Sequence, residues 1–391
     1  MRKHILLLVL TALLACTYHS AKGQPLSPTA KISVLTCGAG EELYSTFGHS
    51  AVRVCDTASG FDRVFNYGMF SFSDPNFYLN FVRGKLNYML GVTSYEVFIG
   101  EYRGDKRWVF EQVLNFTPEE NLQVFEFLVN NSLPENCEYL YDFLFDNCTT
   151  RIRDLLEKNF GGRIAFPNKE LESKPTFRNM LHSYLNEMMW TRLGIDMLLG
   201  KRVDEVATPR QYMFLPDFLF DALDFTTLDG KPIVSESQYL YQAPPIVHRK
   251  PLLSPSIVFI GILVIVIAAH VMKLPLKWFD VSLFLIVGLL GILLLLMWVA
   301  TDHYVTKANF NLLWALPLHA IAAFFLIKKQ RKPWVLWYFA ANMLCCLVLL
   351  LFWGKLPQYL NNALVPFVAL LCFRCFAIAK PLASGITRRK P

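Results

Sequence analysis

The sequence lacks the patterns that mark several common classes of protein. The cysteines between residues 24 and 250 show no C-x-x-C spacing of the kind that holds zinc, so no metal site is expected. Gly40 and Gly48 flank a loop but make no phosphate-binding fingerprint. No basic stretch is interleaved with aromatic residues and no nucleic-acid-binding module is recognisable, which argues against a nucleic-acid partner.

Repeats and low-complexity runs are also absent, and after about residue 250 the chain reads as membrane sequence, with much of its positive charge in short loops. The chain of 391 residues is 54% hydrophobic, and the apolar excess is concentrated in this second part. The stretch 280–300 is long enough to cross a bilayer, which takes about 20 apolar residues. We therefore predict an all-α transmembrane bundle over residues 251–391. Its expected spans, the first being the shortest, are 257–272, 280–300, 310–327, 334–353 and 360–379.

Two independent signals place residues 24–250 outside the cytoplasmic membrane. Residues 1–23 have a basic start, a short apolar run and then small residues, which is a secretory signal pattern. In a second interpretation, "LLAC" is a lipobox and Cys16 becomes a lipidated N-terminus. The distribution of Lys and Arg also favours export, because these residues concentrate in loops that would then face the cytoplasm. The basic loop residues are Lys273, Lys277, the run 328–332 and the C-terminal "TRRKP".

The predicted spans carry no charged residue deep in their middle, which argues against a proton relay or an ion pathway. His270 and His319 are the nearest polar candidates, and Arg374 is close enough to an end for its side chain to snorkel to the interface. The bundle is then either an anchor or a platform that shapes lipid access to the exported domain. In the second case the external loop 301–311 could face the active site.

The exported part reads as an α+β domain with an antiparallel sheet. A helix begins at Thr117, which pairs with Glu120 in a capping box and is followed by Pro118. A second helix begins at Cys148, and helical pattern continues over 176–200. The aromatic region 208–241 is either domain core or a face that rests on the bilayer. The expected strands are 31–37, 49–56, 62–70, 85–92 and 107–116.

Cys148 and His49 are the residues with a setting suited to chemistry. Unsatisfied N–H groups at a helix N-terminus favour a thiolate and can stabilise an oxyanion. His49 begins a strand directly after the Gly48 turn, where its imidazole is exposed to a cleft. The alternative for each is structural: a buried or disulfide-linked cysteine and a turn histidine. The other exported cysteines are Cys37, Cys55 and Cys137, which allow two disulfides, or one bridge such as Cys37–Cys55 and a free thiol.

Two further histidines in the exported part favour structural roles. His182 lies in a helical pattern and is expected to be a surface or a satisfied core histidine, and His248 lies beside Arg249 and Lys250 in an interfacial linker.

Four stretches together resemble the Lnb family of bacterial lipoprotein N-acyltransferases. They are "GAGEELYSTFGHSAVRV", "VFNYGMF", "NFVRGKLNYML" and "YDFLFDNCTTRIRDLL". The order of a histidine on a strand and a later cysteine that opens a helix also resembles circularly permuted papain-like folds. Relatives of lecithin:retinol acyltransferase share this order and likewise move acyl chains from phospholipids. The resemblance implies a permuted papain-like exported domain, followed by a membrane domain in the bacterial inner membrane.

The resemblance also implies a mechanism. Cys148 would take an acyl chain from a membrane phospholipid as a thioester, with His49 as general base, and pass it to the α-amine of a diacylglyceryl-cysteine lipoprotein. No cofactor is required. Asn66 would orient His49, its alternative role being that of a turn asparagine. Candidates for the donor's head group or for local structure are Ser45, Arg53 and Arg151. The competing functions are a periplasmic cysteine peptidase or amidase acting on cell-wall peptide, and a non-catalytic membrane protein with an oxidised Cys148.

Overall fold

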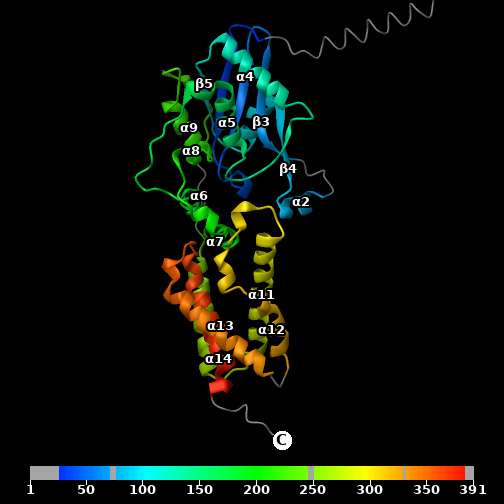
Figure 1. Cartoon of the computed structure of the whole chain (residues 1–391), viewed down its shortest axis with the longest axis vertical. Helices are drawn as coiled ribbons and strands as arrows, with labels where there is room; N and C mark the ends of the chain where they lie inside the picture. The colour runs from blue at the N-terminus through cyan, green and yellow to red at the C-terminus, as the bar shows by residue number, and fades with distance from the viewer. Residues whose placement is uncertain (1–25, 71–75, 245–250, 329–331, 384–391) are drawn as a thin grey trace, which may run out of the picture.

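The computed structural model describes residues 26–70, 76–244, 251–328 and 332–383. The predicted signal segment with Cys16, and the linker residue His248, lie outside the described residues. Figure 1 shows an elongated molecule with a sheet-containing domain at one end and a helical bundle at the other. The fold is therefore mixed α+β, as predicted.

A seven-stranded antiparallel sheet organises the first domain, in the order β10-β5-β1-β2-β3-β4-β6. All five predicted strands are present. The strands of this sheet are β1 (Lys31–Cys37), β2 (His49–Asp56), β3 (Phe61–Met69), β4 (Asn87–Ser94), β5 (Val109–Leu114), β6 (Glu138–Leu140) and β10 (Val234–Tyr241). A small second sheet contains β7 (Ile164–Ala165), β8 (Thr227–Leu228) and β9 (Lys231–Pro232).

Both faces of the large sheet are covered by helices. Successive side chains of a strand point to opposite faces, so β2 contributes to a core on each side of the sheet. Val52 and Val54 of β2 join the core that includes α4 (Pro118–Asn131) and α5 (Cys148–Phe160). Ala51, whose side chain points to the opposite face of the sheet, joins a second core with α3 (Tyr95–Gly104). This sandwich fixes the register of β2 and hence the position of His49 at its start.

The predicted helices are confirmed, and further elements appear. α4 carries the predicted capping box, and α5 begins at Cys148 and ends at Phe160, with Gly161 as its C-cap. The predicted helical pattern over 176–200 is present as two helices, Phe177–Leu185 and Met189–Leu198. Within the region 208–241, residues 212–215, Leu219, Leu223 and Ile233 are buried in the core, as the first alternative stated, whereas its last residues form the largely exposed strand β10. The remaining helices of this domain are α2 (Phe77–Arg83), α6 (Phe177–Leu185), α7 (Met189–Leu198), α8 (Pro209–Tyr212) and α9 (Pro216–Phe225).

The second domain is a bundle of apolar helices. Four segments of the described chain are long and apolar enough to cross a membrane, and α10 is a shorter apolar helix of 17 residues. The third predicted span is broken: a 3-10 turn over Phe310–Leu313 precedes α12, which begins only after Pro317. The helices are α10 (Pro255–Val271), α11 (Lys277–Val299), α12 (Leu318–Leu326), α13 (Pro333–Leu351) and α14 (Val365–Ala383).

Arg374 corrects one expectation for the bundle. Its side chain does not reach an aqueous interface: Arg374 is 4% exposed, and its Nε and Nη2 donate to the two carboxylate oxygens of Asp280 at 2.7 and 2.9 Å. A third polar group joins the pair, because Nη1 of Arg374 lies 3.4 Å from His270 Nδ1. The bundle therefore contains a buried ion pair between α11 and α14, which neutralises a charge that lipid could not solvate.

The loop that follows α11 attaches the two domains to each other. The backbone N–H of Gly200 donates to Val305 O at 2.9 Å, and that of Lys201 donates to Ala308 O at 3.1 Å. A Cβ on Gly200 would lie 1.9 Å from Lys307 O, so this contact requires glycine. These main-chain bonds hold the first domain against the end of the bundle (Figure 1).

Candidate active site

Cys148 is the first residue of α5, and its neighbour Asn147 determines which helix N–H groups are available. The side-chain oxygen of Asn147 accepts from the backbone N–H groups of Thr149 and Thr150, both at 2.9 Å. The amide nitrogen of Asn147 donates to Phe143 O and Phe214 O, which fixes this cap from both sides. The cap therefore holds the Cys148 thiol, which is partly exposed, in a defined position.

The capped helix changes one expectation about the oxyanion. Because Asn147 occupies the N–H groups of Thr149 and Thr150, those two are not free to stabilise a developing negative charge. The backbone N–H of Cys148 itself forms no hydrogen bond with another described residue. It is the group at this helix end that remains available as a donor.

His49 and Asn66 are held together by the pairing of β2 and β3. Val52 lies opposite Phe65, so His49 and Asn66 come close near one end of the pair. Nε2 of His49 donates to Oδ1 of Asn66 at 2.5 Å. This bond fixes the imidazole ring and leaves Nδ1 available to exchange a proton with Cys148, whose charge raises the pKa of His49. Cys148, His49 and Asn66, which the sequence analysis predicted to act together, therefore lie close to one another.

The electrostatics of this cluster favour an ionised thiol. Burial raises the pKa of Cys148, but the charge of His49, the hydrogen bond from His49, and bonds from the Ser50 backbone N–H and the Thr149 hydroxyl outweigh it. The pKa of Cys148 falls from 9.0 to about 7 as a result. Burial lowers the pKa of His49, yet the nearby Cys148 thiolate and the bond to Asn66 raise it above 6.5. The two groups therefore stabilise each other as a thiolate and an imidazolium.

Gly68 of β3 borders both Cys148 and His49. Its φ of +92° is a conformation that L side chains rarely adopt. A Cβ at this position would lie 3.7 Å from Cys148 Cβ and 3.9 Å from His49 Cε1. A side chain at position 68 would therefore contact both reacting groups.

Comparison with known families assigns the two domains of the chain. The family described as the Lnb N-terminal periplasmic domain matches residues 23–183, and the family described as the Lnb transmembrane domain matches residues 245–382. Together they cover more than half of the chain. The chain belongs to the Lnb family. Neither a curated protein nor a solved structure matches it. Family membership and the membrane-length helices make it a membrane protein with a periplasmic domain.

The other predicted site residues of this Lnb protein make their side-chain hydrogen bonds with groups other than Cys148 and His49. Arg53 donates to Asp62 and Glu111 and stacks on the Tyr95 ring, four residues along β2 from His49. The Ser45 hydroxyl donates to Glu42 O at 2.9 Å within the loop that leads to His49.

Arg151 lies one turn of α5 beyond Cys148. It makes a bidentate ion pair with Asp146, stacks 3.8 Å above the Tyr139 ring, and lines a cavity of about 200 Å³ that also contains Lys158. Of the three head-group candidates it is the one on the same helix as the nucleophile.

Sequence reasoning missed several groups that act on the pair. Gly68, the Ser50 backbone N–H and the Thr149 hydroxyl all adjoin Cys148. Arg107 is also buried nearby: its Nε donates to Gly38 O at 2.9 Å, and its charge opposes the rise in the pKa of His49. The position of Thr149 directly after the cysteine was a signal that could have been read, whereas the other contacts depend on the fold.

The cysteine and histidine alternatives are resolved for the described residues. Cys148 is a free thiol, as are Cys37, Cys55 and Cys137. A Cys37–Cys55 bridge is wrong, because the β1–β2 register pairs Cys37 with His49 and Cys55 with Lys31, at opposite ends of the ladder. His182 is a satisfied core histidine, with Nε2 2.8 Å from Asp196 Oδ1 and Nδ1 2.9 Å from Arg192.

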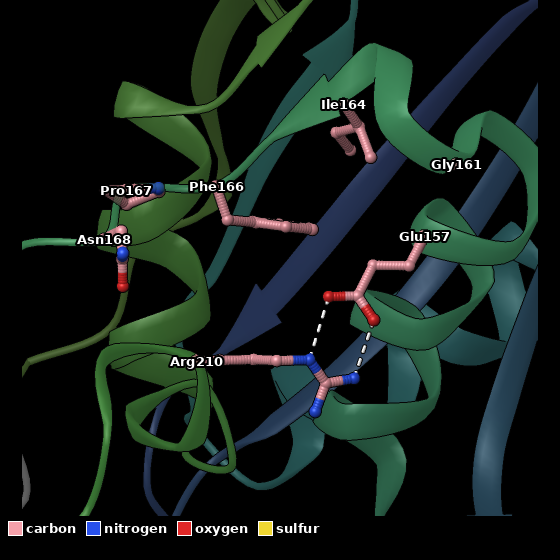
Figure 2. Close-up of a pocket in the computed structure, with 7 residues that line it drawn as sticks. All are labelled: Glu157, Gly161, Ile164, Phe166, Pro167, Asn168 and Arg210. Carbon is pink, nitrogen blue, oxygen red and sulfur yellow. Dashed lines mark hydrogen bonds and ion pairs between the residues drawn. The ribbon is translucent and has the colours of Figure 1, made fainter.

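A separate cavity of about 420 Å³ lies at the opposite end of α5 (Figure 2). Figure 2 shows Arg210 and Glu157 paired across it, with hydrogen bonds of 2.9 and 2.6 Å. Its described lining contains no cysteine or histidine. About 20 Å of helix separates this end from Cys148, so this cavity does not belong to the candidate active site.

Proposed function

We propose that this Lnb protein is a lipoprotein N-acyltransferase of the bacterial inner membrane, with Cys148 as the nucleophile. The observation that carries the proposal is the cluster of a partly exposed thiol of lowered pKa, an imidazole that borders the same glycine as the thiol, and an amide that fixes the imidazole. Such a cluster is suited to acyl transfer through a covalent intermediate. Its attachment to a membrane bundle points to acyl groups that reside in lipid.

In the first half-reaction, the Cys148 thiolate attacks the carbonyl carbon of a phospholipid ester. The carbonyl oxygen becomes an oxyanion that the Cys148 backbone N–H is available to stabilise. The carbon–oxygen bond to the glycerol then breaks, and the His49 imidazolium gives its proton to the leaving alkoxide. The products are a lysophospholipid and an acyl thioester on Cys148.

In the second half-reaction, the free α-amine of a diacylglyceryl-cysteine lipoprotein attacks the thioester. His49, now neutral, takes a proton from the nitrogen, and the Cys148 thiolate leaves. An amide forms, and the resting thiolate–imidazolium pair is restored without an oxidant, a reductant or a metal in the balance. Asn66 supports both steps by holding the ring in one orientation.

The test is mass spectrometry of lipoprotein N-termini in bacterial cells that lack other N-acyltransferases. Cells that express the wild-type chain should contain lipoproteins with a third acyl chain, and cells that express Cys148→Ala or His49→Ala should not. Cys137→Ala is the matched control, since this partly buried thiol lies outside the cluster and its Sγ contacts only Pro134 O at 3.7 Å among hydrogen-bond partners in the described chain.

The same cells separate the proposal from its competitors. Lipoproteins that stay diacylated despite expression of the wild type, together with cleaved cell-wall peptides, would favour the peptidase or amidase. A third acyl chain in the Cys148→Ala cells would show that another residue performs the chemistry.

A further inference from the structure

The short helix α2 is attached to the loop that follows α11. The backbone N–H of Asp302 donates to Arg83 O at 2.9 Å, and Nε2 of His303 donates to Phe81 O, also at 2.9 Å. Gly84 ends α2 with a φ of +69°, and a Cβ there would lie 2.9 Å from the His303 backbone nitrogen. These contacts are close enough to fix the position of α2 along the direction of the α11 axis.

This attachment places α2 at the outer surface of the bilayer. α11 has 23 residues, so it is about 34 Å long, which slightly exceeds the roughly 30 Å of a bilayer's hydrocarbon core. Its end at Val299 therefore marks the outer boundary of the hydrocarbon, and Asp302 follows three residues later. Figure 1 shows α2 beside this loop, on the lower edge of the sheet domain.

α2 presents apolar side chains at this height. Leu79, Phe81 and Val82 are 54%, 51% and 50% exposed, a large apolar area for a helix of seven residues. The exposed side chains of Trp298 and Val299 continue the same apolar character at the end of α11. The contacts with Asp302 and His303 bring the α2 surface to the end of a membrane-length apolar helix, where the acyl region of the outer leaflet is the apolar medium suited to cover it.

A series of aromatic rings connects α2 with the neighbourhood of Cys148. We call Phe81, Phe77, Phe70, Tyr88 and Tyr141 the aromatic track. Successive ring centroids along it lie 6.4, 5.7, 5.3 and 4.2 Å apart.

The inner end of the aromatic track approaches the nucleophile from two directions. Tyr141 packs against the same core as Cys148, with which it shares the loop that leads into α5. Phe70 follows Gly68 by two residues, and Gly68 borders Cys148 directly. Phe81 is exposed and Phe70, Tyr88 and Tyr141 are partly exposed, so the track runs along the surface of the domain, although the stacked faces of Tyr88 and Tyr141 cover each other.

We propose that α2 inserts its apolar side chains into the outer leaflet and that the donor acyl chain reaches Cys148 along the aromatic track. This inference rests on the proposed acyltransferase function and names the route of its substrate. The exposed parts of aromatic rings suit this task, because they give an acyl chain apolar contact. The track would lead the ester, at the head of the chain, to the Cys148 thiol beside Gly68.

Photocrosslinking tests the contact without relying on catalysis. Benzoylphenylalanine is placed at Val82 in the full chain, which is reconstituted in vesicles of phosphatidylethanolamine and phosphatidylglycerol. Val97 on α3 is the matched control, since it is also a valine and is 54% exposed. The inference predicts lipid adducts at position 82 at least about tenfold above those at position 97. Equal yields at the two positions, or a protein–protein adduct in place of lipid at position 82, would overturn it.

A rate comparison tests the route. Thioester formation on Cys148 is measured with vesicle phospholipid and with a soluble ester, p-nitrophenyl butyrate, for the wild type, Val82→Glu and Val97→Glu. Loss of one buried valine contact corresponds to about tenfold, so Val82→Glu should lose at least about tenfold more rate with vesicles than with the soluble ester, and Val97→Glu should match the wild type.

The outcomes separate the two proposals. A wild type that forms no thioester with either donor contradicts the acyltransferase function itself. A working wild type whose Val82→Glu variant is equally fast with vesicles, or equally slowed with both donors, contradicts the route alone.

Discussion

Replacement of His49 by alanine tests the electrostatic account of the nucleophile. The charge and hydrogen bond of His49 are the main groups that oppose the effect of burial on Cys148 and bring its pKa to about 7. Without them, burial dominates, and the pKa of Cys148 should return to 9.0 or above. The wild-type Cys148 thiol therefore ionises as the pH rises through about 7, and the thiol of the variant ionises about two pH units higher.

The expected change in the alkylation rate of Cys148 differs between pH 7 and pH 10. At pH 7 a thiol of pKa 7 is about half ionised and one of pKa 9 about 1%, so the variant has about 50-fold less thiolate. A thiolate of higher pKa is intrinsically more nucleophilic, by about eightfold over two units. We therefore expect the variant to be alkylated about sixfold more slowly at pH 7 and about eightfold faster at pH 10, where both thiols are ionised.

The assay is iodoacetamide alkylation of the detergent-solubilised full chain between pH 5 and 10, with Cys148 followed by peptide mass spectrometry. Cys137 in the same digest serves as an internal control, because no change near it accompanies the substitution. Identical pH profiles of Cys148 in the wild type and in His49→Ala would refute the thiolate–imidazolium pair. A uniform change at all pH values, without the crossover, would show an effect on access alone.

The remaining predictions concern single contacts. Gly68→Ala and Gly60→Ala share the strain of a positive φ, about 1–2 kcal/mol, so both should lose stability in thermal unfolding. A Cβ on Gly60 meets nothing within 4 Å, so Gly68→Ala alone should also lose acyl transfer. Asn66→Ala should lower kcat by at least about tenfold with little change in KM, and an unchanged kcat would contradict the orienting role. Asp280→Asn should destabilise the bundle by about 3–5 kcal/mol, since it leaves Arg374 buried and unpaired; an unchanged melting temperature in detergent would contradict this.

The central elements of the domain could be predicted because their signals are local. The capping residues of α4 and the period-two alternation of β2 lie within a few residues of each other, so the sequence states them directly. The position of Cys148 at the start of a helix was predictable for the same reason. The proximity of His49 and Asn66 was a prediction about strand order, and it holds because β2 and β3 are consecutive antiparallel strands.

The contacts between distant segments could not be predicted. α2 has only seven residues and lies where it does because of hydrogen bonds to a loop more than two hundred positions away. The partner of Arg374 is on another helix, and the sequence pattern alone favours snorkelling for an arginine near a helix end. A possible Cys37–Cys55 bridge was likewise a statement about register, which depends on the whole β1–β2 ladder.

The most direct measurement is the intact mass of the purified full chain after incubation with phospholipid and without an acceptor lipoprotein. The account predicts a mass increase equal to one acyl chain, located on the Cys148 peptide, removed by neutral hydroxylamine as a thioester is, and lost when a diacylglyceryl-cysteine peptide is added as that peptide gains an amide. An unmodified Cys148 under these conditions, alongside a peptide that still becomes N-acylated, would contradict the proposed covalent mechanism.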